Sequence, residues 1–179
     1  MQLWLALPRN ERWAEPRLQD LKAERVPATR DNGSTIKLYS GSFSGLVSPL
    51  LNYTPLLLAD ISMENGARAS HELPGDFNIF IYLIGGELNV GEAQDRLNPG
   101  EVGWLDLPGQ AGTTNLHLTA GENGARFLVY GGKPTGDPIV SHGPFIGDST
   151  DDIHRLYEAY RKGAMQHIDT VPAGQKLYW

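Results

Sequence analysis

The alternation of apolar and polar positions along this chain predicts a series of short β-strands. The clearest is the run from Phe77 to Leu83, in which apolar and aromatic residues lie between the turn signals Pro74-Gly75 and Gly85-Gly86. An apolar run of this length between turn signals is typical of a buried strand. Further strands with turn-forming residues at their ends are predicted at residues 34–40, 56–63, 87–91, 102–107, 113–119 and 125–130. This pattern indicates an antiparallel sandwich or barrel.

A single stretch near the C-terminus carries a helical pattern instead. Ser149 is a good N-cap, and Asp152 three residues later comes close to completing a capping box. The apolar residues that follow recur at helical spacing and form one stripe: Ile153, Leu156, Tyr157 and Tyr160. Gly163 is the stop signal. We therefore predict one C-terminal α-helix that docks on the barrel.

These patterns divide the chain into four parts. Residues 1–25 have no period and form a leader that we expect to pack on the barrel, and residues 26–145 hold the strands. Residues 146–163 contain the helix, and residues 164–179 form a tail without a period. We expect the tail to be either loose or held in place by its two terminal aromatic residues.

The central strand sends alternate side chains to opposite faces, so one of two sets lines the interior. The two sets are Phe77, Ile79, Ile81 and Leu83, or Asn78, Phe80, Tyr82 and Ile84. A small barrel can hold a ligand, and a pocket lined by the first set would suit a small apolar molecule. The interpretation that we favour is a packed core without a ligand.

Composition narrows the classes of function. The formal charge of −6 argues against phosphate attraction as the basis of function, so we expect no direct nucleic-acid partner. Cysteine is absent, which excludes disulfides and thiolate metal sites and agrees with a cytoplasmic location. The opening MQLWLALP lacks the basic and long apolar parts of a signal peptide, and no run is long enough to span a membrane.

The stretch from Gly66 to Gly109 has the layout of a cupin half-barrel. Metal-binding cupins place a His-x-His pair before the central strand, a Glu after it, and another His beyond a later Pro-Gly turn. Here His71 fits one position and Leu73 stands in the next, while Asn78 and Thr113-Thr114 stand near the other two. The sequence thus predicts an all-β fold, a cupin-type antiparallel β-barrel of the jelly-roll or double-stranded β-helix kind, with its ligand positions mostly vacant.

Two separate blocks of the chain resemble the pirin family. The first has the order of motifs seen in the segment that follows the first of two cupin domains in pirins: Gln2-Leu3-Trp4, Leu7-Pro8 and Glu15-Pro16-Arg17. The second resembles the C-terminal region of pirins and comprises Lys133-Pro134, Pro138-Ile139, Gly143-Pro144-Phe145, Ser149 and Tyr160 to Gly163. The resemblance extends from the opening residues to about Gly163 and matches the C-terminal cupin with its preceding linker.

This resemblance implies that the metal centre of the family belongs to a domain that the present sequence does not include. Pirins are bicupins whose N-terminal cupin binds a metal, usually iron, through a His-x-His and a later His-x-Glu, and carries the family's quercetin dioxygenase activity. The present sequence contains neither motif, and the N-terminal metal-binding cupin is absent from it. None of the family's metal-binding or catalytic residues can therefore be transferred to this chain.

His71 and His117 are the candidates for a residual metal site, with Glu72 as a third ligand. A metal site needs three or four ligands at about 2.0–2.2 Å. If residues 69–73 are extended, His71 and Glu72 point to opposite faces. His117 lies between two leucines and faces outward if they face inward. We therefore predict no metal site, and we interpret the two C-terminal histidines, His142 and His154, as structural.

We interpret the chain as a pirin-like cupin without the family's metal ligands, a non-catalytic structural, binding or regulatory module that needs no cofactor. A single cupin exposes surface that a partner domain would cover, so we predict a homodimer. One alternative is a quercetinase-like dioxygenase or an isomerase with a non-standard metal site, such as an Fe site, that includes His71. Another is a fragment of a full-length pirin whose activity lies in the missing domain.

Overall fold

The computed structural model describes residues 2–106 and 112–179, which belong to two compact units. Unit 1 joins Met1–Asp20 to Thr135–Trp179, and unit 2 is Leu21–Pro134. The barrel predicted for residues 26–145 falls in unit 2 up to Pro134, whereas the residues beyond it belong to unit 1. The packing of the leader on the barrel stays a prediction.

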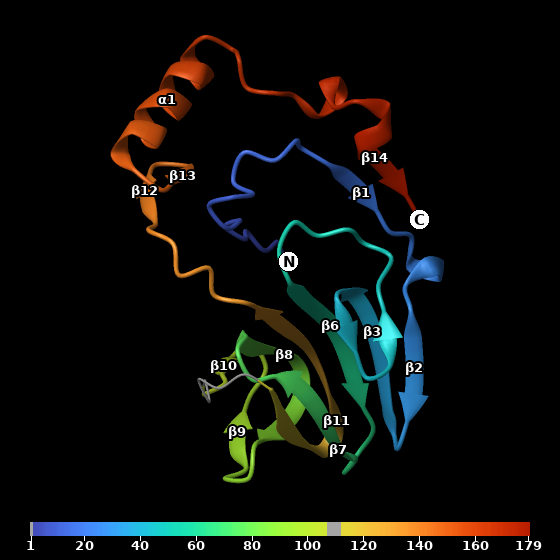
Figure 1. Ribbon diagram of the computed structural model, residues 1–179. Coiled ribbons are helices and arrows are strands. Elements are labelled where there is room, and N and C mark those ends of the chain that lie inside the picture. The colour runs from blue at the N-terminus through green and yellow to red at the C-terminus, as the bar shows by residue number, and fades with distance from the viewer. Residues whose placement is uncertain (1, 107–111) are drawn as a thin grey trace. The chain divides into compact units, whose positions relative to one another are not determined.

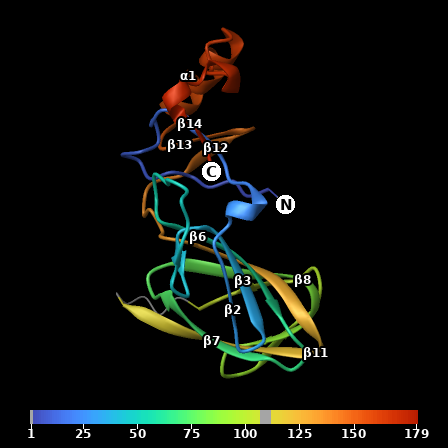
Figure 2. The ribbon, with the colours of Figure 1, turned by 90° about the vertical axis from the view of Figure 1, so that its right-hand side faces the viewer.

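Unit 2 is built almost entirely of strands. They are β2 (Ala28–Asp31), β3 (Ser34–Ser40), β4 (Ser42–Phe43), β5 (Leu46–Val47), β6 (Leu56–Met63), β7 (Arg68–Pro74), β8 (Asn78–Val90), β9 (Asp95–Leu97), β10 (Val102–Trp104) and β11 (Thr113–Gly132), preceded by the 3₁₀ turn η1 (Ala23–Arg25). An 8-stranded sheet has the order β10-β8-β11-β6-β3-β2, with β7 paired to β11 and β9 to β8. Figure 2 shows these strands curving around a common interior.

β11 is the strand that bends this sheet into a barrel. Its first part, residues 113–119, pairs with β7, and its last part, residues 125–132, pairs with β6. β8 pairs with β11 along the opposite edge (Figure 1). Because the two ends of one strand bond to different neighbours, the sheet must twist and curl between them.

β8 and β11 both continue through glycines where the sequence pattern predicts turns. The turn predicted at Gly85-Gly86 and the break predicted between the strands at residues 113–119 and 125–130 are therefore wrong, since each strand is unbroken and the pairing shifts register at this point. Gly86 has a φ of 80°, and a Cβ atom there would lie 2.1 Å from the carbonyl oxygen of Gly124. The glycines form a bulge in which the two backbones approach closely.

Other strand predictions agree with the structure. Those at residues 34–40 and 56–63 are confirmed as β3 and β6, and the run from Phe77 to Leu83 lies almost wholly in β8. The strand predicted at residues 102–107 is β10, which ends at Trp104, and residue 107 lies outside the described residues. Short apolar runs thus located the strands but not all of their ends.

The core of unit 2 is formed by the inward side chains of the long strands. Ile79 is 3% exposed, and Ile81 and Leu83 are fully buried, so the first of the two predicted sets faces the interior. They pack with side chains from four other strands: Ile36, Leu38, Leu57, Ala59, Ile61, Leu73, Leu116, Leu118, Phe127 and Val129. Burial of this apolar surface is the main stabilising contribution to the barrel.

The outward face of the sheet carries a row of aromatic side chains. Trp104, Phe80 and Tyr130 are cross-strand neighbours on β10, β8 and β11. The ring centroid of Phe80 lies 4.9 Å from that of Trp104 and 4.8 Å from that of Tyr130. Tyr130 is buried, whereas Trp104 is 70% exposed, so the row ends in an open indole at the edge strand.

Unit 1 combines the beginning and the end of the described chain. Its elements are β1 (Leu18–Asp20), β12 (Val140–His142), β13 (Phe145–Gly147), α1 (Thr150–Arg161), β14 (Lys176–Tyr178) and the 3₁₀ turns η2 (Ile168–Thr170) and η3 (Ala173–Gln175). β1 and β14 pair in parallel, and the amide of Trp179 donates to the carbonyl of Asp20 at 2.9 Å (Figure 1). The last residues of the tail are thus held by backbone pairing, whereas the two terminal aromatic side chains that were expected to hold the tail are exposed.

The predicted C-terminal helix is confirmed as α1, together with its capping box. The amide of Asp152 donates to Ser149 Oγ at 3.2 Å, and the amide of Ser149 donates to Asp152 Oδ2 at 3.1 Å. A hydrogen bond from Arg155 holds the pKa of Asp152 below its ordinary value, helped by the backbone amide of Asp148 and by Ser149.

No helix in the described part of the chain has the length and apolar character needed to cross a membrane.

A buried ion pair fastens the leader within unit 1. Arg12 Nη2 lies 2.7 Å from Asp148 Oδ1, and the two side chains are only 7% and 6% exposed. Arg9 approaches the same carboxylate at 3.8 Å but is 70% exposed. The guanidinium of Arg155 lies 5.1 Å from the ring centroid of Trp13, within cation–π range. The leader is thus attached to the segment that opens α1.

Candidate functional site

The pairing of β7 with β11 decides where the two candidate histidines point. Leu116 lies opposite His71, and Ser70 lies opposite His117. Cross-strand partners share a face of the sheet, and successive residues of a strand alternate between faces. Because Leu116 is a core residue, His71 faces the interior and His117 faces the other way. The two imidazoles therefore cannot bind one ion.

His71 lies in a small aromatic and polar surrounding. Its ring centroid is 5.1 Å from that of Phe43, and its Nδ1 is 3.0 Å from Ser44 Oγ. Its Nε2 is buried without a hydrogen-bond partner among the described residues. Burial lowers the pKa of His71 from 6.5, and the negative charge of Asp31 opposes this shift only in part. The ring is thus neutral at pH 7.

The neighbours of His71 on the interior face offer no further ligands. Ala69 and Leu73 precede and follow it on that face of β7, and Leu73 is fully buried. Glu72 points to the other face, where its carboxylate accepts a hydrogen bond from Thr113 Oγ1 at 3.2 Å. Among the residues that the structure describes, no three His, Asp or Glu side chains are grouped to hold a metal ion.

The central strand, for which we weighed a possible pocket against the favoured packed core, packs into the core. Ile79, Ile81 and Leu83 are packed inside the core, and Phe77 is half-buried against it. Phe77 instead lines a cavity of about 460 Å³ in unit 2, with Pro74 and residues 41–42 and 52–57. Of the four residues considered as possible pocket lining, Phe77 borders this cavity.

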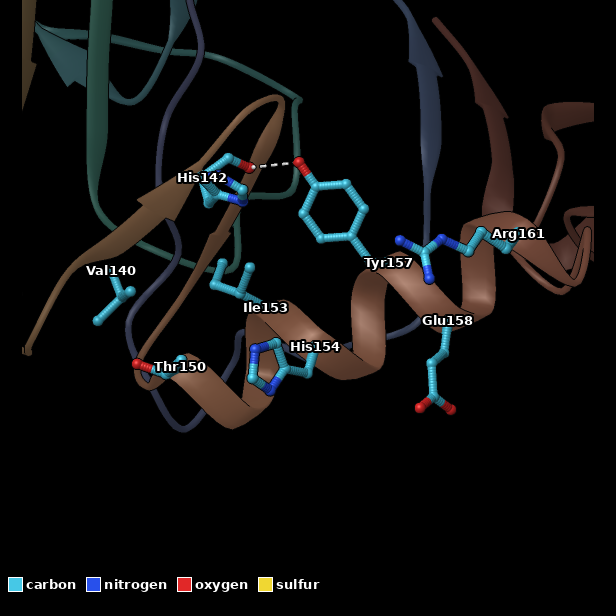
Figure 3. Close-up of a pocket in the computed structure, with 8 residues that line it drawn as sticks. All are labelled: Val140, His142, Thr150, Ile153, His154, Tyr157, Glu158 and Arg161. Atoms are coloured by element: carbon cyan, nitrogen blue, oxygen red, sulfur yellow. Dashed lines mark hydrogen bonds between the residues drawn. The ribbon is translucent and has the colours of Figure 1, made fainter.

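A larger cleft, of about 590 Å³, lies in unit 1 between α1 and β12 (Figure 3). β12 contributes Val140 and His142, which are two positions apart and so share a face. The residues from α1 recur every three or four positions and therefore form one stripe along the helix: Thr150, Ile153, His154, Tyr157, Glu158 and Arg161. The cleft thus follows the whole length of the helix.

Apolar and aromatic groups form the part of the cleft next to β12. Ile153 is 3% exposed and Val140 is half-buried. The ring of Tyr157 lies 5.5 Å from that of His142, and its hydroxyl donates to the carbonyl of His142 at 3.4 Å (Figure 3). Phe145 packs edge-on against the same tyrosine at 4.9 Å. These contacts fix the hairpin and the helix around Tyr157.

The charged groups of the cleft lie toward the C-terminal end of α1. The carboxylate of Glu158 accepts a hydrogen bond from Lys162 Nζ at 3.2 Å, which offsets its charge. Arg161 is exposed and makes no ion pair with the described residues. His142 and His154 add imidazole nitrogens. The charged side chains that line the cleft are thus one carboxylate, paired with Lys162, and one guanidinium.

This cleft was not predicted from the sequence. From the pattern we interpreted His142 and His154 as structural and expected Tyr157 to belong to the stripe that docks the helix. Helical spacing does put Tyr157 and Arg161 on one side of α1, so part of the signal was present. The opposite wall depends on how the β12–β13 hairpin folds back beside the helix, which no local pattern specifies.

Comparisons with known proteins identify the family. The family model of the pirin C-terminal cupin domain matches residues 58–166. Pirin from Rattus norvegicus is 32% identical over 163 residues, covering 90% of this chain and 55% of that protein. Pirin from Homo sapiens is 29% identical over 163 residues with the same two coverages, 90% and 55%. The chain thus spans about half the length of these curated relatives.

Solved structures show the same fold. The crystal structure of quercetin 2,3-dioxygenase from Acinetobacter baumannii matches with a TM-score of 0.78 at 22% identity, over 89% of this chain and 55% of that one. A structure from Geobacillus kaustophilus matches with a TM-score of 0.70 at 30% identity, over 74% and 53%. They confirm the predicted all-β, cupin-type fold with one C-terminal helix. The chain belongs to the pirin family and corresponds to its C-terminal cupin domain.

Proposed function

We propose that this protein is a pirin-type cupin that acts as a non-catalytic structural, binding or regulatory module. The observation that carries the proposal is the position of His71 on the interior face of the barrel. Its neighbours on that face are Ala69, Leu73 and Leu116. Hydrocarbon side chains cannot coordinate an ion, whereas a catalytic metal centre typically needs three protein ligands around an open position.

The surroundings of His71 support a packing role for its ring. Burial favours the neutral imidazole, and the ring contacts Phe43 while Nδ1 and Ser44 Oγ form a hydrogen bond. His117 lies on the opposite face of the sheet and cannot complete a site with it. The alternative, a dioxygenase or isomerase with a non-standard metal centre, would have to recruit ligands from outside this face.

Elemental analysis tests the proposal directly. The protein is purified without a chelator and without a histidine tag, and iron, zinc, nickel and manganese are measured per chain. We expect far less than one metal ion per chain, and the same content in His71→Ala. The variant His117→Ala serves as a matched control because its imidazole faces away from the interior.

A stoichiometric metal that disappears in His71→Ala and persists in His117→Ala would overturn the proposal. It would favour the enzyme alternative, which then predicts oxygen consumption with a flavonol substrate by the metal-loaded protein. Such activity in the full chain, lost on removal of the metal, would contradict a non-catalytic role.

A further inference from the structure

We propose that the cleft between α1 and β12 binds a small aromatic monocarboxylate. The ring of the ligand lies against His142, Ile153 and Tyr157, and its carboxylate binds the guanidinium of Arg161. The proposal goes beyond the module function described above, because it assigns a site and a ligand class within unit 1. It does not depend on the metal content of the barrel.

The size and lining of the cleft suit a small organic molecule. Its volume of about 590 Å³ lies within the range of small-molecule sites, roughly 300–1,000 Å³. Such sites combine apolar and aromatic walls with a few polar groups. Here Val140 and Ile153 supply aliphatic surface, and the rings of His142 and Tyr157 supply faces and edges against which another ring can pack.

The charges of the cleft select an anion with a single charge. Glu158 is paired with Lys162, whereas Arg161 has no ion pair among the described residues. A guanidinium binds a carboxylate through two parallel hydrogen bonds, a geometry that a lysine cannot offer. One available guanidinium matches one carboxylate. A ligand with several negative charges would bring some of them close to Glu158.

The helix also separates the two groups that would hold the ligand. Tyr157 and Arg161 are four residues apart, so their backbone positions are about 6 Å apart along the α-helix. A carboxylate attached directly to a ring spans less than this. A ring that carries its carboxylate on a two-carbon chain comes closer to this spacing, so the probe that we choose is an arylpropionate.

The test uses the full chain and two matched probes, 3-phenylpropionate and its neutral analogue 3-phenylpropan-1-ol. Each is titrated into isotopically labelled protein while amide chemical shifts are followed by NMR. We expect saturable shifts for residues 140–161 with the carboxylate, with a Kd of about 1 mM or lower. The alcohol should bind at least about fivefold more weakly, because it cannot pair with Arg161.

Three variants locate the binding. Arg161→Gln should weaken the binding of 3-phenylpropionate about fivefold to tenfold. The variant should keep the NMR spectrum of a folded protein, since this side chain is exposed. Arg68→Gln removes an exposed arginine of unit 2 and should change nothing. Tyr157→Phe keeps the ring and should retain most of the affinity.

Several results would overturn the proposal. They are the absence of any saturable shift with 3-phenylpropionate, shifts confined to unit 2, and equal affinity for the carboxylate and the alcohol. An Arg161→Gln variant that binds as tightly as the wild type would also contradict it. None of these results bears on the metal analysis, so the two proposals fail independently.

Discussion

The close approach of β8 and β11 at Gly86 makes a quantitative prediction for the substitution Gly86→Ala. A Cβ atom there would lie 2.1 Å from the carbonyl oxygen of Gly124, where ordinary contact is 3.4–4 Å. The strands would have to separate locally by about 1 Å, which breaks the neighbouring ladder hydrogen bonds. Losing two of them costs about 2 kcal/mol. The φ of 80° adds about 1 kcal/mol of backbone strain for alanine.

Two other glycines of the same region separate these contributions. Gly91 has a φ of 75° but nothing within 4 Å of its would-be Cβ, so Gly91→Ala should cost only the strain, about 1 kcal/mol. Gly85 has open space and no positive φ, so Gly85→Ala should be neutral or stabilising by up to about 1 kcal/mol. Gly86→Ala should cost about 3 kcal/mol in total.

Urea denaturation of the three variants provides the measurement, with the free energy of unfolding compared at equal m-values. The order of stability should be Gly85→Ala, then Gly91→Ala, then Gly86→Ala. If Gly86→Ala were no less stable than Gly91→Ala, the two backbones would not meet at the bulge. The pairing of β8 with β11 as continuous strands would then be incorrect.

Three further predictions concern other parts of the molecule. Because the pKa of folded His71 lies below 6.5, the stability that its neutral ring contributes should be fully present above pH 6.5 and should be lost as the pH falls through the folded-state pKa. Denaturation midpoints measured over this pH range should fall less in His71→Leu. Arg12→Met leaves the buried carboxylate of Asp148 with only the exposed Arg9 at 3.8 Å and should destabilise the fold by about 3–5 kcal/mol, against less than about 1 kcal/mol for the exposed Arg9→Met. Light scattering should give a dimer of the 19.6 kDa chain that Trp104→Ser weakens, and a monomeric wild type would refute the homodimer.

The sequence predicted the parts of this fold that follow from local chemistry. The apolar alternation of residues 34–40 and 56–63 located β3 and β6 to the residue, because strands with one buried face repeat every two positions. Ser149 located the start of α1, because its hydroxyl accepts the amide of Asp152. Each of these two signals depends only on residues that are a few positions apart in the chain.

Features that depend on distant segments were not predicted. Glycine pairs favour turns and bulges alike, and only the presence of β11 beside β8 makes Gly86 part of a bulge. The candidate cleft was missed for a related reason, since His142 lines it only because β12 lies beside α1. The flanking leucines predicted an outward His117 if they faced inward, but the direction of His71 follows only from the register of β7 with β11.

The parallel pairing of β1 with β14 has a consequence for the order in which the molecule can form. Unit 2 is one uninterrupted segment, Leu21–Pro134, and all its strands leave the ribosome before the residues that complete unit 1. β1 precedes the barrel in the chain and yet pairs with Lys176–Tyr178, which follow the barrel. Domains tend to fold as they emerge. The barrel can therefore form while β1 still lacks its partner, and loss of residues 176–178 would leave β1 without its partner strand.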